Sequence, residues 1–133
     1  MNSLNPKAQV LVVEDDPDVA DMLSELLGLE GYRVMQAREG REALALLRGG
    51  ATPDVILLDL MMPEMNGWQF RQAQLADARF AKVPVVVLSA DCSTQEKAVN
   101  LGARFGLRKP VDIERLLEVL EKIQPSHAPA ARS

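Results

Sequence analysis

The feature that most constrains the fold of this chain is a set of short, β-branched apolar runs. Three of these runs, centred on Val12, Ile56 and Val86, are apolar on consecutive residues and not on alternate ones. A strand with apolar side chains on both sides must be covered on both faces, as happens in parallel sheets flanked by helices. The runs therefore predict a parallel sheet buried between two layers.

Segments with helical periodicity separate the strands. The predicted strands are Gln9–Val13, Tyr32–Ala37, Val55–Leu58, Val85–Leu88 and Arg104–Arg108. The predicted helices are Pro17–Leu29, Arg41–Arg48, Gly67–Ala78, a helix from Ser93 to about Gly102, and one from Ile113 to Ile123. This alternation predicts an α/β fold of (βα)5 type, a doubly wound five-stranded parallel sheet with helices on both faces.

Three helix starts carry capping signals. Asp16 before Pro17 is predicted to cap the first helix, and Asp112 the last. The segment 93–96, Ser-Thr-Gln-Glu, predicts a capping box.

Length and charge limit the organisation of the chain. Its 133 residues suit one domain, predicted over residues 8–123, between a disordered segment 1–7 and a flexible Pro/Ala-rich tail or linker stub at 124–133. The net charge of −4 gives no basic surface for direct nucleic-acid binding, and no apolar run is long enough for a membrane span. One cysteine, Cys92, and no visible signal peptide favour a cytoplasmic location.

Chemically active side chains follow four of the predicted strands. Glu14 and Asp15 come after the first, Asp59 after the third, Ser89 after the fourth and Lys109 after the fifth. The carboxyl ends of parallel strands form one edge, where open α/β sheets bind their ligands. These residues are therefore predicted to form a single site.

Three carboxylates held together repel one another unless a cation lies among them. Hard oxygen ligands favour Mg²⁺, and a carboxylate beside Mg²⁺ can act as a nucleophile that forms an aspartyl phosphate. Taken singly, Glu14 and Asp15 also fit a solvated acidic turn, Lys109 an ordinary loop lysine, and Asp59 a strand end or helix cap. Their combination favours a phosphoryl-acceptor site.

The sequence resembles the response-regulator receiver domains of two-component signalling from about Ala8 to Ile123. The matching segments are VLVVEDDPD (10–18), DVILLDLMMPEMNGW (54–68), VPVVVLSA (83–90), GARFGLRKP (102–110) and the closing helix. The resemblance implies the flavodoxin-like strand order 2-1-3-4-5. It also implies a signalling module that catalyses its own phosphorylation and dephosphorylation, with a sensor histidine kinase or histidine phosphotransfer protein as partner.

The resemblance implies a role for each site residue. Asp59 is the expected phosphoacceptor, Ser89 the switch hydroxyl and Lys109 the lysine that contacts the phosphoryl group. Mg²⁺ is expected at Glu14, Asp15, Asp59 and the backbone carbonyl of Met61. A cis peptide bond is expected before Pro110, and Pro63 and Gly67 are expected in the turn after Asp59, where glycine allows positive φ and close packing.

One position departs from the family pattern. Receivers carry an aromatic residue three positions before the lysine, and this chain has Gly106 there. Phe105 is adjacent, but a shift of one residue along a strand sends its side chain to the opposite face. We therefore expect signalling to use movement around Ser89–Ser93 in place of an aromatic rotation.

Other functions are weighed against this one. A receiver-shaped module that signals without phosphorylation stays open, as does a receiver excised from a hybrid kinase or a DNA-binding regulator. A small aspartyl phosphatase needs a second acid where Met61 stands. A flavodoxin-like cofactor binder needs a phosphate loop where the chain has Glu14-Asp15-Asp16, and no GxxxxGK[ST] loop supports a nucleotide kinase.

Overall fold

A computed structural model describes residues 8–61 and 66–123 of the chain. The predictions for the terminal segments 1–7 and 124–133, and for Pro63, lie outside the described residues.

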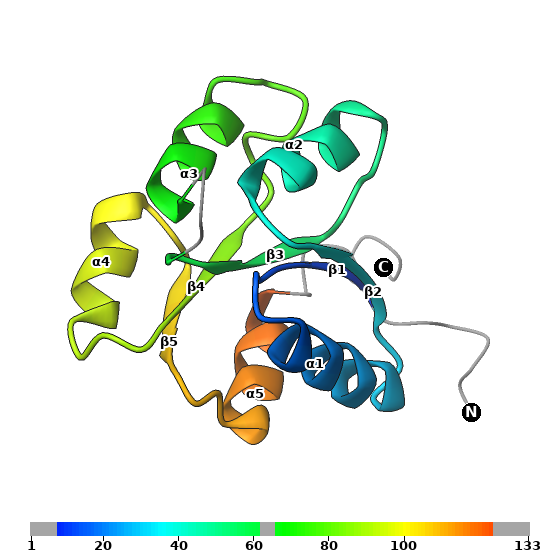
Figure 1. The fold of residues 1–133 in the computed structure, drawn as a ribbon, viewed down its shortest axis with the longest axis vertical. Helices are drawn as coiled ribbons and strands as arrows, with labels where there is room; N and C mark the ends of the chain where they lie inside the picture. The colour runs from blue at the N-terminus through cyan, green and yellow to red at the C-terminus, as the bar shows by residue number, and fades with distance from the viewer. Residues whose placement is uncertain (1–7, 62–65, 124–133) are drawn as a thin grey trace, which may run out of the picture.

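Five parallel strands form one sheet in the order β2-β1-β3-β4-β5 (Figure 1). The strands are β1 Gln9–Val13, β2 Arg33–Ala37, β3 Val55–Asp59, β4 Val85–Ser89 and β5 Phe105–Arg108. Every residue of β3 and β4 is buried, which agrees with their continuous apolar sequence. The predicted strand order and parallel direction are confirmed.

Five helices cover the two faces of this sheet (Figure 1). They are α1 Pro17–Leu29, α2 Gly40–Arg48, α3 Gly67–Leu75, α4 Thr94–Leu101 and α5 Ile113–Ile123. One core cluster joins the sheet to α1 and α5, and a second joins it to α2, α3 and α4. In β1 to β4, odd and even residues contribute to opposite clusters, so both faces of this part of the sheet are covered.

Two predicted helix caps are confirmed and one is wrong. The Asp16 carboxylate accepts from the Asp18 amide at 3.0 Å, and the Asp112 carboxylate accepts from the Glu114 amide at 3.0 Å. Ser93 makes no capping hydrogen bond, because its amide and hydroxyl both donate to the Asp91 carboxylate, at 2.9 and 2.8 Å. The Ser93 side chain therefore hydrogen-bonds to a nearby aspartate and not to the amides of the first turn of α4.

The start of α3 holds the capping box that the sequence analysis did not predict. The Asn66 side chain accepts from the Gln69 amide, and the Gln69 side chain accepts from the Asn66 amide, both at 3.0 Å. The helix ends at Leu75, earlier than the predicted Ala78, because Asp77 turns the chain and its carboxylate accepts from the Arg79 amide at 3.0 Å.

Gly67 is needed for close packing, not for positive φ. Gly67 does not have a positive φ angle, although several other glycines of the chain do. A Cβ at this position would lie 2.6 Å from Leu60 Cδ2 and 2.9 Å from Leu60 Cα. The close-packing half of the prediction is confirmed and the positive-φ half is wrong.

None of the helices within residues 8–61 and 66–123 combines the length and apolarity that a membrane span requires.

Candidate functional site

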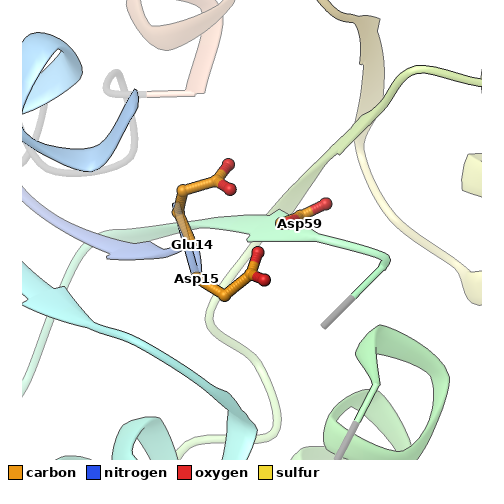
Figure 2. A group of neighbouring side chains, drawn as sticks. All are labelled: Glu14, Asp15 and Asp59. Atoms are coloured by element: carbon orange, nitrogen blue, oxygen red, sulfur yellow. The ribbon is translucent and has the colours of Figure 1, made fainter. Parts of the chain in front are cut away.

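Three carboxyl groups gather where β1 and β3 end (Figure 2). Val13 of β1 pairs with Leu58 of β3, which brings the residue after each of them, Glu14 and Asp59, to the same edge. Asp15 follows Glu14 in the turn before α1, and the carboxylate oxygens of the three residues lie within 4.8 Å of one another. The sheet register thus produces the predicted acidic cluster.

Burial makes the charges in this cluster costly. Glu14 is 1% exposed and Asp59 3% exposed, whereas Asp15 is exposed to solvent. Burial, and next the negative charge of Glu14, raise the pKa of Asp59 from 3.8 to about 7. The ammonium of Lys109 and the Met61 amide oppose this rise. Asp59 is therefore a carboxylate whose charge the fold only partly compensates.

Lys109 reaches into the cluster from the loop after β5. Its Nζ lies 2.8 Å from Glu14 Oε1 and 3.6 Å from Asp59 Oδ2. Burial alone lowers the pKa of Lys109, but the hydrogen bond to Glu14 and the charges of Asp59 and Glu14 outweigh it and raise the pKa. The Lys109–Pro110 peptide bond is cis, as expected. Lys109 is thus a fixed cation between two buried acids.

Ser89 ends β4 beside Asp59. Leu88 pairs with Asp59, and Ser89 is 1% exposed. The Ser89 hydroxyl oxygen accepts from the Asp91 amide at 3.1 Å, and its carbonyl accepts from the Lys109 amide at 2.8 Å. The serine is therefore tied to the loop that leads into α4 and to the loop that carries Lys109.

Met61 has a contact that the sequence analysis did not predict. Its amide donates to Asp59 Oδ1 at 3.2 Å, which orients the carboxylate, and its side chain is 71% exposed. The predicted use of its backbone carbonyl as a metal ligand stays a prediction.

Two further residues at this edge were missed. The Thr94 hydroxyl donates to the Ser89 carbonyl at 3.3 Å and to the Asp91 carbonyl. Lys97 pairs with the Asp91 carboxylate at 2.6 Å. The polar sequence between Ser89 and α4 was the available signal, but it does not specify which of its side chains face the strand.

The residues present suit a divalent cation with oxygen ligands. Glu14, Asp15 and Asp59 supply only carboxylate oxygens, and two of the three are buried with one shared lysine as counter-charge. Such a donor set is the kind that holds Mg²⁺ while leaving positions for water and a phosphoryl oxygen. One lysine does not offset the charge of three carboxylates, so the arrangement suits a site that is completed by a divalent cation.

Comparison with known proteins places the chain beside members of one protein family. The response regulator receiver domain profile matches residues 10–121. The chain is 34% identical over 118 residues to protein PilH of Pseudomonas aeruginosa, covering 87% of this chain and 97% of PilH. It is 38% identical over 111 residues to the DNA-binding dual master transcriptional regulator RpaA of Synechocystis, covering 82% of this chain.

The chain matches 46% of the length of RpaA, so it spans about half of that relative. Among solved structures, the chemotaxis protein CheY4 of Vibrio cholerae is similar, with a TM-score of 0.80 and 35% identity. That match covers 88% of this chain and 98% of CheY4.

Proposed function

The chain belongs to the response regulator receiver domain family, and from this premise we propose that it accepts a phosphoryl group on Asp59 from a phosphohistidine protein. The observation that carries the proposal is the buried Asp59 carboxylate, with the Lys109 ammonium 3.6 Å away and two more acids within 4.8 Å. Ending a strand does not require several buried charges, which are costly, so their presence points to a functional site.

In the proposed transfer, a carboxylate oxygen of Asp59 attacks the phosphorus. A new P–O bond forms, the P–N bond to the donor histidine breaks, and the imidazole keeps the electron pair of that bond. In dephosphorylation, which is a separate step, water attacks the phosphorus and gives up a proton to the solvent, the P–O bond to Asp59 breaks with its electron pair returning to the carboxylate, and inorganic phosphate leaves. The chain thus catalyses its own phosphorylation and dephosphorylation while serving as a signalling module.

Positioning and charge balance are the main contributions of the protein to such a transfer. The Met61 amide holds Asp59 Oδ1, which leaves the other oxygen, Oδ2, on the side of Lys109. Lys109 is proposed to pair with a phosphoryl oxygen, and the Ser89 hydroxyl is proposed to donate to another.

Glu14, Asp15, Asp59 and the Met61 backbone carbonyl are the proposed holders of Mg²⁺. When bound, the ion supplies positive charge that offsets the repulsion between the acids and the incoming phosphoryl group.

The proposed partners are a sensor histidine kinase or a histidine phosphotransfer protein as donor, and a downstream protein target. This target is proposed to bind the face formed by α4, β5 and α5, which phosphorylation is proposed to switch. A cytoplasmic location follows from such partners. The receiver unit is proposed to span residues 8–123, either alone or as part of a larger regulator.

Intact-protein mass spectrometry with acetyl phosphate tests the proposal directly. We expect one phosphoryl-sized mass increase that requires Mg²⁺ and is lost in Asp59→Asn. Asp21→Asn, at an exposed position on α1, is the matched control and should keep the increase. A folded protein that gains no mass with Mg²⁺ present would instead support a receiver-shaped module that signals without phosphorylation.

A further inference from the structure

Arg71 of α3 is a buried cation without an acidic partner in the described part of the chain. It is 9% exposed, and within residues 8–61 and 66–123 no carboxylate pairs with its guanidinium group. Lys109, by contrast, has two carboxylates beside it. Buried charges are costly unless they are compensated, and most of them are paired. The Arg71 charge therefore requires a physical explanation.

The neighbours of Arg71 compensate only part of its charge. It donates from Nε to the Leu101 carbonyl and from Nη2 to the Gly102 carbonyl, both at 3.0 Å, and from Nη1 to Gln74 Oε1 at 2.8 Å. The carbonyl end of a helix such as α4 carries about half of an elementary negative charge, and the glutamine is neutral. The guanidinium group thus keeps an excess of positive charge.

Two N–H groups of Arg71 also remain available. A guanidinium group has five N–H donors, and the three hydrogen bonds above use one on each nitrogen. The other N–H groups, one on Nη1 and one on Nη2, have no acceptor among the residues that the structure describes. Arginine with free donors is well suited to bind a carboxylate.

Arg71 lines a cavity of about 250 Å³ between α3 and the end of α4, which lie side by side (Figure 1). Three apolar side chains, those of Trp68, Leu75 and Leu101, form part of its wall. Three amide side chains complete the described lining, including that of the exposed residue Gln72. Among the described residues that line the cavity, Arg71 is the only charged one. The cavity therefore combines an excess positive charge with apolar walls.

These walls indicate what kind of anion the cavity suits. Trp68 is 38% exposed and Leu75 is 51% exposed, so apolar surface here is uncovered. A flat ring stacks well on an indole group. Pockets for larger ligands measure about 300–1,000 Å³, so this smaller cavity suits a ligand of about one ring. An inorganic anion would use the charge of Arg71 but leave the apolar wall uncovered.

We propose that this cavity binds a small organic acid, whose carboxylate pairs with Arg71 and whose flat apolar body packs against Trp68. The bound acid supplies the missing negative charge and bridges α3 to the end of α4. None of the residues assigned to the phosphoryl-acceptor site lines the cavity, so this inference does not depend on the proposed function.

Phenylacetate is the probe, because it joins one ring to one carboxylate. Trp68 is the single tryptophan of the chain, so its fluorescence reports on the cavity directly. We expect a saturable change with a dissociation constant of about 1 mM or lower. Phenylacetamide has the same shape without the charge and should bind at least about tenfold more weakly. Acetate, which lacks the ring, should give no saturable change.

Gln72→Glu tests the charge requirement without removing Arg71. The substitution keeps the size of an exposed side chain, preserves the three hydrogen bonds of Arg71 and adds a carboxylate to the cavity wall. It should weaken phenylacetate binding at least about tenfold. Gly28→Glu is the matched control, because it adds the same charge on α1, on the other face of the sheet, where a Cβ meets nothing within 4 Å. The control should bind phenylacetate as the wild type does.

The NMR signal of the Arg71 Nε–H group identifies the contact itself. It should shift as phenylacetate saturates the protein, and it should shift much less with phenylacetamide. A fluorescence change that stays linear in probe concentration overturns the proposal. Equal affinity for phenylacetamide, or equal phenylacetate binding by Gln72→Glu and the wild type, also overturns it, because the cavity would then be only an apolar groove. Binding of an acidic peptide without binding of phenylacetate overturns it in favour of a protein contact.

Discussion

Replacing Asp59 by asparagine is expected to stabilise the metal-free protein above neutral pH. The pKa of Asp59 lies near 7 in the folded protein, against 3.8 for an ordinary aspartate, because the carboxyl group is buried next to Glu14. One pH unit of such a difference corresponds to about 1.4 kcal/mol, so the ionised Asp59 costs the fold up to about 4 kcal/mol. Asparagine keeps the shape and removes the charge, while Lys109 keeps its 2.8 Å pair with Glu14.

The sign of the pH dependence follows from the raised pKa. Below about pH 4, Asp59 is protonated in both the folded and the unfolded chain and imposes no penalty. Between about pH 4 and pH 7 the unfolded chain gives up its proton more readily than the folded one, so the wild type loses stability relative to Asp59→Asn. Above about pH 7 the difference is complete and constant.

Urea unfolding of both proteins, in EDTA and at several pH values, measures this difference. Adding Mg²⁺ should then raise the free energy of unfolding of the wild type more than that of Asp59→Asn, because an ion that binds only the folded state stabilises it by mass action. The reasoning is refuted if Asp59→Asn is no more stable than the wild type near pH 8 in EDTA, or if the advantage grows toward acid pH.

Three further changes test other parts of the structure. Lys109→Met leaves buried Glu14 without its cation and should lower the free energy of unfolding by about 3 kcal/mol at neutral pH, in urea titrations. Gly67→Ala forces a Cβ to within 2.9 Å of Leu60 Cα and should cost about 1–3 kcal/mol, with an unchanged unfolding midpoint counting against the packing argument. Asp16→Ala removes the acceptor for the Asp18 amide and should cost about 1 kcal/mol, whereas Asp16→Asn should retain most of the stability.

The strands and the acidic edge are the parts that the sequence predicts best. Consecutive apolar residues in β3 and β4 leave parallel pairing as the natural solution, and parallel pairing alone brings Glu14 and Asp59 to one edge. This inference needs only the common direction of the strands, because the carboxyl ends of parallel strands lie at one edge of the sheet.

Features that depend on competition between side chains were beyond the sequence. Ser93 has the residue type of a cap, yet Asp91 two positions earlier took its hydrogen bonds. Gly106 was recognised as unusual, but the close approach of Thr94 and Ala98 depends on how α4 packs across β5. Packing distances of this kind emerge from the assembled layers, not from local pattern.

The residues of the site are synthesised at different times, because its charges come from strands far apart along the chain. Glu14 and Asp59 meet as soon as β1 pairs with β3, whereas Lys109 arrives only when β5, at the edge of the sheet, is added beside β4. While β5 is still inside the ribosome, the growing chain therefore has Glu14 and Asp59 without Lys109 to pair with them. The proposed phosphoryl-acceptor site is consequently complete only in a molecule whose sheet includes β5.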